Sequence, residues 1–433
     1  MSSIQAKITA VESAIIKKPP FCTGHVQINE RSSTLFYKTD DASNAKFLSL
    51  TSATTDDLQK LTNACLPAKF GLGQEDVLDE SYRKARKMDI DNFMVGFDPS
   101  TIVDVIRQEL LDSEDVQAAL EVELYKLNVY DKGSFFKAHR DTPRRRDMFA
   151  SLVIVFPTPH EGGKLLLRHD TEEWAFDSTQ VLAGTQTPSA AFIAFYSDVE
   201  HEVTTVEAGH RVTLTYNIYR GGLDPEDNNK FVANKAEIGS GPSGAGNLKG
   251  IPHIQSARKP SASLLKANIT NLLLAPTCLP RGGYFGFGLR FMYPAFGGKE
   301  FDLQEMMKQL KGSDAIIKQV CAALKLKTAL RLYAHTKYSD GFLLSKPVDL
   351  SDCGEVEDVD RAFREMGAEQ IKVVDWDNTR NSTKPRIMWL SPKTEYVSYE
   401  SVYMAYGNEA SLGNIYGHVC LVAKVGRFGH RET

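Results

Sequence analysis

Three residues of the types that bind metal ions stand out in this chain, because His139 and Asp141 lie two positions apart and His201 follows later. Two neutral imidazoles and one carboxylate can occupy one face of a ferrous ion and leave three coordination positions open. Residues two apart in a β-strand point to the same side, so His139 and Asp141 can reach one metal while Arg140 points away. Arg211 offers a planar, permanently charged guanidinium that suits a dicarboxylate. These residues predict a catalytic metal site with a bound organic acid.

The bulk composition is that of a globular protein. With 433 residues the chain exceeds the usual single core, so two domains are expected. Its formal net charge of −4 disfavours a surface that coats nucleic acid. Neither a signal peptide nor an apolar run long enough for a membrane span is found in the sequence, so no membrane partner is expected. Six cysteines without paired spacing favour reduced thiols, and the expected compartment is the cytoplasm or the nucleus.

The elements that must position these residues begin with helices. A helical pattern opens at Thr55, and a second opens after Asp98, with an apolar stripe from Ile102 to Leu110. The charged stretch 79–87 is interpreted as the solvated face of a helix. Later the chain changes to short β-rich segments punctuated by Gly, Pro and Asp, which is typical of an all-β barrel or jelly roll. The predicted strands are 122–130, 135–141, 148–156, 164–167, 190–196 and 211–219.

A polar segment rich in small residues separates the two halves of the chain. Residues 223–263 are expected to form a linker or a long surface loop. Residues 1–222 are expected to form an α+β domain, with flanking helices and a jelly roll whose core spans about 120–220. Residues 264–433 are expected to form a mixed α/β accessory domain, with a degenerate barrel as one form. Its predicted elements are strands at 284–293, 371–376, 386–390 and 418–425, and a helix that is capped by Ser313-Asp314 and runs through Leu324.

The segment from about 120 to 220 carries several motifs in a fixed order. They are Leu127-Asn128-Val129-Tyr130, Gly133, Phe135-Phe136, His139-Arg140-Asp141, Glu161-Gly162-Gly163, Phe195, Glu200-His201-Glu202-Val203 and Gly209-His210-Arg211-Val212-Thr213. The set resembles the prolyl 4-hydroxylase-like branch of the iron(II)/2-oxoglutarate-dependent dioxygenases, whose catalytic domain is a double-stranded β-helix (jelly roll). A catalytic barrel followed by a second, iron-free domain is similar to some fungal two-domain members of that family.

The resemblance implies a role for each motif residue. The metal ligands would be His139, Asp141 and His201. Arg211 would pair with the distal carboxylate of 2-oxoglutarate, and Thr213, on the same strand face, would donate its hydroxyl to that carboxylate. Tyr130 and Leu165 stand where the family lines its cosubstrate pocket. The implied cofactors are iron(II), 2-oxoglutarate and dioxygen, with ascorbate as an optional addition.

The resemblance also implies a reaction, the hydroxylation of a prolyl residue or an amino-acid-like substrate with release of succinate and carbon dioxide. Asp141 stands where the family's halogenases carry a small residue, so hydroxylation is favoured over halogenation. Strand 148–156 lacks a tyrosine that some prolyl hydroxylases use as a cosubstrate contact. The substrate class, a protein or peptide or else a small molecule, therefore stays open, as does the oligomeric state.

Two arginines follow closely after the predicted ligand Asp141. Arg144 and Arg145, on a loop expected near the pocket mouth, are either substrate contacts for an acidic group or a solvated charge cluster.

Three rival functions are disfavoured by the sequence. A nucleic-acid demethylase of the same superfamily would carry a second arginine where Asn217 stands, which disfavours that function. A zinc hydrolase has no need for Arg211 or Thr213. An interaction platform that has lost catalysis is disfavoured because the full set of ligands is present.

Overall fold

The computed structural model divides the chain into two compact units. The larger unit contains residues 19–253 and 404–412, and the smaller unit contains residues 1–18, 254–403 and 413–433. This division differs from the expected one because the first 18 residues group with the second half of the chain. The expected linker, 223–263, lies almost wholly outside the described residues. The described residues are 3–15, 17–39, 45–72, 75–111, 119–145, 147–221, 262–296, 302–336, 339–346, 356–374, 384–394, 406–407 and 415–431.

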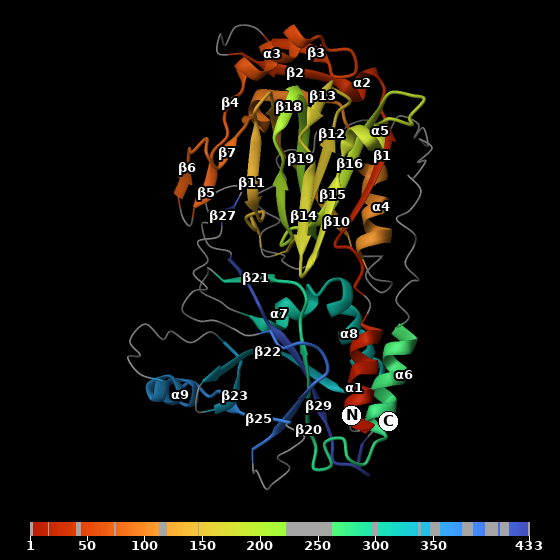
Figure 1. Ribbon diagram of the computed structural model, residues 1–433, viewed down its shortest axis with the longest axis vertical. Coiled ribbons are helices and arrows are strands. Elements are labelled where there is room, and N and C mark those ends of the chain that lie inside the picture. Colours follow the sequence, from red (N-terminus) through yellow and green to blue (C-terminus); the bar gives the residue numbers. More distant parts are fainter. Residues whose placement is uncertain are drawn as a thin grey trace. The chain divides into compact units, whose positions relative to one another are not determined.

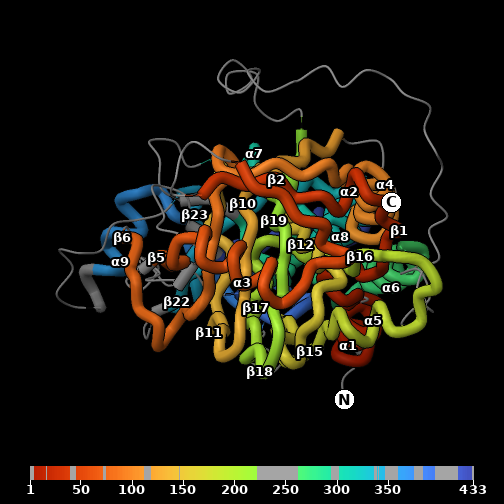
Figure 2. The backbone as a smooth tube through the Cα atoms, turned by 90° about the horizontal axis from the view of Figure 1, so that it is seen from above, coloured from red at the N-terminus to blue at the C-terminus, as the bar shows by residue number. Residues whose placement is uncertain are grey.

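Two sheets form the core of the larger unit, and their paired strands are antiparallel. Figure 2 shows β10, β19, β12, β16 and β1 of the major sheet side by side. The major sheet runs in the order β1 (Phe21–Gln27), β16 (Ser189–Tyr196), β12 (Met148–Val155), β19 (Arg211–Arg220), β10 (Leu120–Tyr130), β8 (Arg86–Asp89) and β4 (Leu66–Pro67). The minor sheet runs in the order β15 (Glu172–Phe176), β14 (Leu165–His169), β17 (Glu200–Val203), β11 (Phe135–His139) and β7 (Arg83–Lys84).

The predicted strands of the jelly roll are confirmed as β10, β11, β12, β14, β16 and β19, with β11 ending at His139 instead of Asp141. Every residue of β16 is buried, which explains its unbroken apolar sequence. Helix α4 (Ser100–Leu110) contacts β1, and its apolar stripe, including Ile102 and Ile106, is buried. The Tyr196 hydroxyl of β16 donates to the Leu110 carbonyl at 2.7 Å, which ties the sheet to the end of this helix.

The charged stretch 79–87 contains no helix, so its interpretation as a solvated helix face was wrong. It contains β7 and the start of β8, and Arg83 is only 3% exposed. Charge density along the sequence does not reveal which strand will pair with the segment. Here β7 pairs with β11, and the Arg83 guanidinium lies over the Phe136 ring, 4.2 Å from its centroid.

Shorter elements surround the two sheets of the larger unit. Helix α3 begins with a capping box, in which Thr54 accepts from the backbone N–H of Asp57 and the Asp57 carboxylate accepts from that of Thr54. The other elements are α2 (Glu30–Ser33), β2 (Thr34–Lys38), β3 (Ala45–Ser49), α3 (Thr55–Ala64), β5 (Phe70–Leu72), β6 (Glu75–Val77), η1 (Ile90–Asn92), β9 (Phe93–Val95), β13 (His160–Gly162), α5 (Ser178–Leu182), β18 (Val206–Gly209) and β27 (Tyr406–Gly407).

The smaller unit is built on one mixed sheet (Figure 1). Its two edge strands, β24 and β25, are separated only by the buried residue Ile371, so the sheet curls into a nearly closed barrel. The sheet order is β24 (Glu369–Gln370), β23 (Ser339–Leu344), β22 (Lys327–Thr336), β29 (Cys420–Val425), β20 (Gly283–Gly288), β26 (Arg386–Trp389) and β25 (Lys372–Val373). The other elements are α1 (Ser3–Ala14), α6 (Ala262–Leu273), β21 (Tyr293–Phe296), α7 (Leu303–Lys308), α8 (Gly312–Ala323), α9 (Val356–Glu365) and β28 (Ile415–Gly417).

Two predictions in the smaller unit needed correction. The expected strand 284–293 stops at Gly288, and β21 starts only at Tyr293. Helix α8 forms as predicted, but Asp314 does not cap it. The fully buried Asp314 carboxylate instead accepts the backbone N–H groups of Arg290 at 3.0 Å and Phe291 at 3.1 Å. Its role is to hold the segment between β20 and β21.

None of the helices in the described part of the chain is long and apolar enough to cross a membrane. The five cysteines that the structure describes are free thiols and buried. Burial raises the pKa of the Cys65 thiol to about 12 and that of Cys278 to about 11. These thiols are therefore protonated and unreactive at neutral pH. Cys353 lies outside the described residues.

Candidate active site

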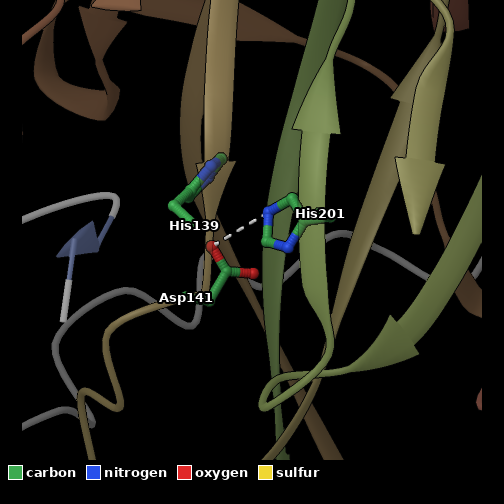
Figure 3. A group of neighbouring side chains, drawn as sticks. All are labelled: His139, Asp141 and His201. Carbon is green, nitrogen blue, oxygen red and sulfur yellow. Dashed lines mark ion pairs between the residues drawn. The ribbon is translucent and has the colours of Figure 1, made fainter. Parts of the chain in front are cut away.

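Strand pairing in the minor sheet brings the predicted metal ligands together. His139 is the last residue of β11 and lies directly opposite His201 of β17, while Asp141 follows two residues later. The three ligand atoms lie within 4.8 Å of one another, and His201 Nε2 is 3.8 Å from Asp141 Oδ1 (Figure 3). All three side chains are buried, with exposed fractions of 5–6%. Among the described residues, no other group of His, Cys, Asp and Glu is so arranged.

Hydrogen bonds that both imidazoles donate to backbone carbonyls orient the two rings toward a shared point. His139 Nδ1 lies 2.8 Å from the Lys137 carbonyl oxygen, and His201 Nδ1 lies 3.0 Å from that of Val199. Because a carbonyl can only accept, Nδ1 carries the proton and Nε2 keeps its lone pair for a metal. Burial, together with the neighbouring His201, lowers the pKa of His139 well below its usual value, which favours the neutral, ligating form.

The carboxylate ligand has its own support, which the sequence analysis missed. Ser151 of β12 is fully buried, and its hydroxyl donates to Asp141 Oδ2. The other carboxylate oxygen, Oδ1, lies 3.8 Å from His201 Nε2, on the side of the two imidazoles. Two imidazole nitrogens and one carboxylate oxygen on one side of the site fit a ferrous ion. In the sequence, the only sign of this partner of Asp141 was a serine within an otherwise apolar predicted strand.

Arg211, at the start of β19, is a buried guanidinium with no counter-ion among the described residues. It is 2% exposed, and its Nε has no hydrogen-bond partner among the described residues. No carboxylate in the described part of the chain lies within ion-pairing distance of Arg211. Burial lowers the pKa of Arg211, and the nearby Tyr130 opposes that effect, with its ring centroid 5.6 Å from the guanidinium carbon. An arginine buried in this way needs an anionic ligand, because an unpaired buried charge is costly.

The glycine pair before β14 makes room for Arg211. Gly163 has a φ of +65°, which favours glycine. A Cβ atom at this position would lie 2.9 Å from Arg211 Cδ and 2.8 Å from Val206 Cγ2. The motif Glu161-Gly162-Gly163 therefore does more than turn the chain, since it also leaves space for the side chain of Arg211.

One cavity contains all of the predicted metal and cosubstrate residues. Thr213 and Tyr130 are buried, and the Thr213 hydroxyl points to the Asn128 carbonyl at 3.5 Å. Phe136 stacks on His139 with ring centroids 3.5 Å apart, and the Phe195 ring lies beside His201. The cavity is lined by Arg83, Tyr125, Lys126, Asn128, Tyr130, Phe136, His139, Asp141, Val153, Leu165, Phe195, His201, Val203, Arg211, Thr213 and Thr215.

The two predicted substrate arginines are not among the residues that line this cavity. Arg145 forms ion pairs with Glu121 at 3.0 Å and with Asp147 at 2.5 Å, so its charge is balanced within the protein. Arg144 donates to the Tyr125 hydroxyl and lies over that ring, 4.7 Å from its centroid. Arg144 therefore contacts Tyr125, which is one of the lining residues, and Arg146 of the same arginine run lies outside the described residues.

Sequence analysis missed two basic residues of the cavity, Arg83 and Lys126. Both are buried, with exposed fractions of 3% and 2%. Arg83 lay in the charged stretch that was interpreted as a helix face. Lys126 lay in a predicted strand, where strict alternation would place Tyr125 and Lys126 on opposite faces. No sequence signal marks the irregularity in β10 that brings both side chains to the cavity.

Residues 125–219 match the family described as the 2OG-Fe(II) oxygenase superfamily. Among curated proteins, none matches the chain. Solved structures with similar folds include a Pseudomonas putida prolyl-4-hydroxylase, at 15% identity and a TM-score of 0.30 over 50% of this chain and 100% of that one. A Trichoplax adhaerens prolyl hydroxylase, solved with a hypoxia inducible factor peptide fragment, gives 18% identity and a TM-score of 0.28 over 50% of this chain and 92% of that one.

A third similar structure is an oxidoreductase of the 2OG-Fe(II) oxygenase family from Burkholderia pseudomallei. It shows 21% identity and a TM-score of 0.23 over 38% of this chain and 76% of that one. At such TM-scores the three structures carry no functional argument for this chain. The family match and the His-Asp-His triad are independent of them. Together they mark residues 125–219 as a segment of the 2OG-Fe(II) oxygenase type, a superfamily that uses iron(II), 2-oxoglutarate and dioxygen.

Proposed function

We propose that the larger unit is an iron(II)- and 2-oxoglutarate-dependent hydroxylase of the prolyl 4-hydroxylase-like branch, acting on a prolyl residue or an amino-acid-like substrate. The observation that carries the proposal is the joint burial, in one cavity, of a triad of metal-ligand types and an arginine that has no counter-ion among the described residues. A metal site alone would allow several reactions. Arg211 adds a requirement for an organic anion beside the metal, which a zinc hydrolase does not have.

The residues of the cavity would have separate roles in the proposed reaction. When bound, iron(II), 2-oxoglutarate and dioxygen supply the oxidation that converts a C–H bond of the substrate into C–OH and 2-oxoglutarate into succinate and carbon dioxide. His139, Asp141 and His201 would hold the iron. Arg211 would bind the distal carboxylate of 2-oxoglutarate, with the Thr213 hydroxyl as a second donor. Tyr130 and Leu165 would form the walls that orient the cosubstrate.

The aromatic rings next to the histidines would keep water from the reacting centre. Phe136 covers the face of His139, and the Phe195 ring centroid lies 4.6 Å from that of His201. Both phenylalanines are buried, with exposed fractions of 2% and 1%. A dry cavity strengthens the electrostatic attraction between Arg211 and a carboxylate, because the local dielectric constant is low.

The test measures 2-oxoglutarate binding and succinate release by the full chain loaded with iron(II). We expect an iron-dependent absorption band on anaerobic addition of 2-oxoglutarate and slow succinate release in air. The variant Arg211→Gln should raise the KM for 2-oxoglutarate on the order of tenfold to a hundredfold, because a charge-assisted bidentate contact is lost.

The matched control is Arg168→Gln, on β14. Arg168 pairs with Glu173 and Glu202 and does not line the cavity, so its loss should leave the KM for 2-oxoglutarate unchanged. A wild-type protein that neither binds 2-oxoglutarate nor releases succinate would contradict the proposal. That result would favour the rival function, an interaction platform without catalysis.

A further inference from the structure

The cavity is lined by more basic side chains than the proposed binding of iron and 2-oxoglutarate uses. Among the described lining residues, Arg83, Lys126 and Arg211 are basic, and Asp141 is the one acidic residue. The two charges of iron(II) and the single charge of Arg211 balance Asp141 and the two carboxylates of 2-oxoglutarate. The ion's own charge must be included in such a count. Arg83 and Lys126 are the two basic lining residues that this balance does not include.

Arg83 is rigidly held close to the metal ligands. Its Nη1 donates to the Lys69 carbonyl at 2.6 Å, and its Nη2 donates to Asn128 Oδ1 at 3.2 Å. Its guanidinium lies 4.2 Å from the centroid of Phe136, which in turn stacks on His139. A single aromatic ring therefore separates Arg83 from a metal ligand.

A bulge in β10 brings Lys126 and Tyr125 to the same cavity. The pairing of β10 with β19 shifts between Leu124 and Lys126, which leaves Tyr125 as an extra residue. Bulges re-aim side chains in this way, and they are common beside active sites. Both side chains consequently line the cavity, with Lys126 Nζ 4.0 Å from the centroid of the Tyr125 ring.

The environment of Lys126 is strongly positive. Burial lowers the pKa of Lys126 well below its usual value, and the neighbouring charges of Arg83, Lys87 and Arg144 lower it further. Asp89 offsets part of this effect but itself pairs with Lys87, with 3.2 Å between Lys87 Nζ and Asp89 Oδ1. An anion bound between Arg83 and Lys126 would relieve this repulsion.

We propose that Arg83 and Lys126, together with Tyr125, form a second anion subsite that binds a carboxylate of the substrate beside the metal. The substrate is then a small organic acid of net negative charge. A prolyl residue inside a peptide has no carboxylate to place there, and the ammonium group of a zwitterionic amino acid would face two cations. This inference rests on the proposed function. Of the substrates proposed there, it selects a small molecule over a prolyl residue.

The first test compares acids with their neutral analogues on the wild-type enzyme, so it does not depend on the folding of a variant. The probes are a panel of N-acetyl amino acids and other small organic acids, each paired with its carboxamide, and a proline-containing peptide with blocked ends. Mass spectrometry detects a gain of one oxygen that depends on 2-oxoglutarate. We expect at least one acid to be hydroxylated and its carboxamide to react at least tenfold more slowly.

The second test removes the cations from the subsite. Arg83→Gln and Lys126→Gln should each raise the KM for the reacting acid on the order of tenfold or more, and Arg83→Lys should restore part of the loss. The KM for 2-oxoglutarate should change less than threefold in all three variants. Lys132→Gln, at an exposed position outside the cavity, is the control and should change neither constant.

The outcomes separate this inference from the proposed function. Wild-type enzyme that binds 2-oxoglutarate but hydroxylates the blocked peptide, or hydroxylates carboxamides as fast as acids, would overturn the subsite and leave the hydroxylase standing. Hydroxylation of no acid in the panel, with 2-oxoglutarate binding intact, would also overturn the subsite. Loss of 2-oxoglutarate binding itself would instead contradict the proposed function.

Discussion

At the residue scale, the metal site depends on partners outside the triad. The Nδ1 atoms of His139 and His201 are bound to carbonyl oxygens of their own strand segments, which any residue type can supply. Asp141 differs, because its Oδ2 atom accepts a hydrogen bond from the hydroxyl of Ser151, which belongs to β12 of the major sheet. Such partners fix the direction of a ligand, and their loss commonly lowers metal affinity. Ser151 is therefore the residue outside the triad on which metal binding should depend most.

Replacing Ser151 with alanine tests this dependence. We expect Ser151→Ala to lower the affinity for iron(II), or for manganese(II) as a stable substitute, on the order of tenfold to a hundredfold. A titration of the metal-free protein measures the affinity. Ser197→Ala is the matched control, because Ser197 is equally buried and its hydroxyl points to the Met148 carbonyl at 3.4 Å. Equal affinities in the two variants would show that Ser151 does not position Asp141.

At the element scale, the turn that leads into β14 controls access to Arg211. Gly163→Ala would force a residue with a Cβ to adopt a φ of +65° and would place that atom 2.9 Å from Arg211 Cδ. The conformation alone costs roughly 1–2 kcal/mol. Because Arg211 has to move, we expect the KM for 2-oxoglutarate to rise at least tenfold, with metal affinity nearly unchanged.

Steady-state kinetics and a metal titration of Gly163→Ala measure these two effects. Gly184→Ala provides the control, because a Cβ atom there would meet nothing within 4 Å and the backbone has no positive φ. A substitution at Gly163 that weakens metal and 2-oxoglutarate binding equally would indicate general unfolding of the site. That result would argue against a specific role in seating Arg211.

At the scale of the whole molecule, the two units should respond to acid in opposite directions. Burial raises the pKa of Asp314 in the smaller unit to about 6. Asp314 thus binds a proton more tightly in the folded protein than in the unfolded chain. Its protonation therefore stabilises the smaller unit at low pH, and this contribution is lost as the pH rises through about 6. In the larger unit, burial lowers the pKa of His160 and of His210. Their contribution is present above pH 6.5 and is lost as pH falls through the lowered values.

Hydrogen exchange read by mass spectrometry can follow each unit separately. Between pH 7 and pH 4 we expect protection to increase in the core of the smaller unit, by about 2 kcal/mol for a pKa shift of this size, and to decrease in the larger unit. Asp314→Asn should abolish most of the pH dependence in the smaller unit alone. Parallel behaviour of both units in the wild-type protein would contradict the assignment.

The sequence by itself determined which residue types could form the site, and it determined the main strands. Ligand types, the spacing of His139 and Asp141, and the position of Arg211 were all readable, because alternation along a strand decides which neighbours share a face. The same local rule predicted β10, β12, β16 and β19 correctly. It failed where a strand departs from strict alternation, as at the bulge beside Tyr125.

Only the tertiary structure decided which distant residues share the cavity. Arg83 and Ser151 reach the metal ligands through strand pairings between segments far apart in the sequence. The same pairings bury Arg211 away from every described carboxylate, so it does not form half of an ion pair with the described residues. Burial and pairing are properties of the assembled sheets, and they determine which basic side chains line the cavity. The sequence thus specified the ligands, whereas the packing of the sheets specified what else can bind beside them.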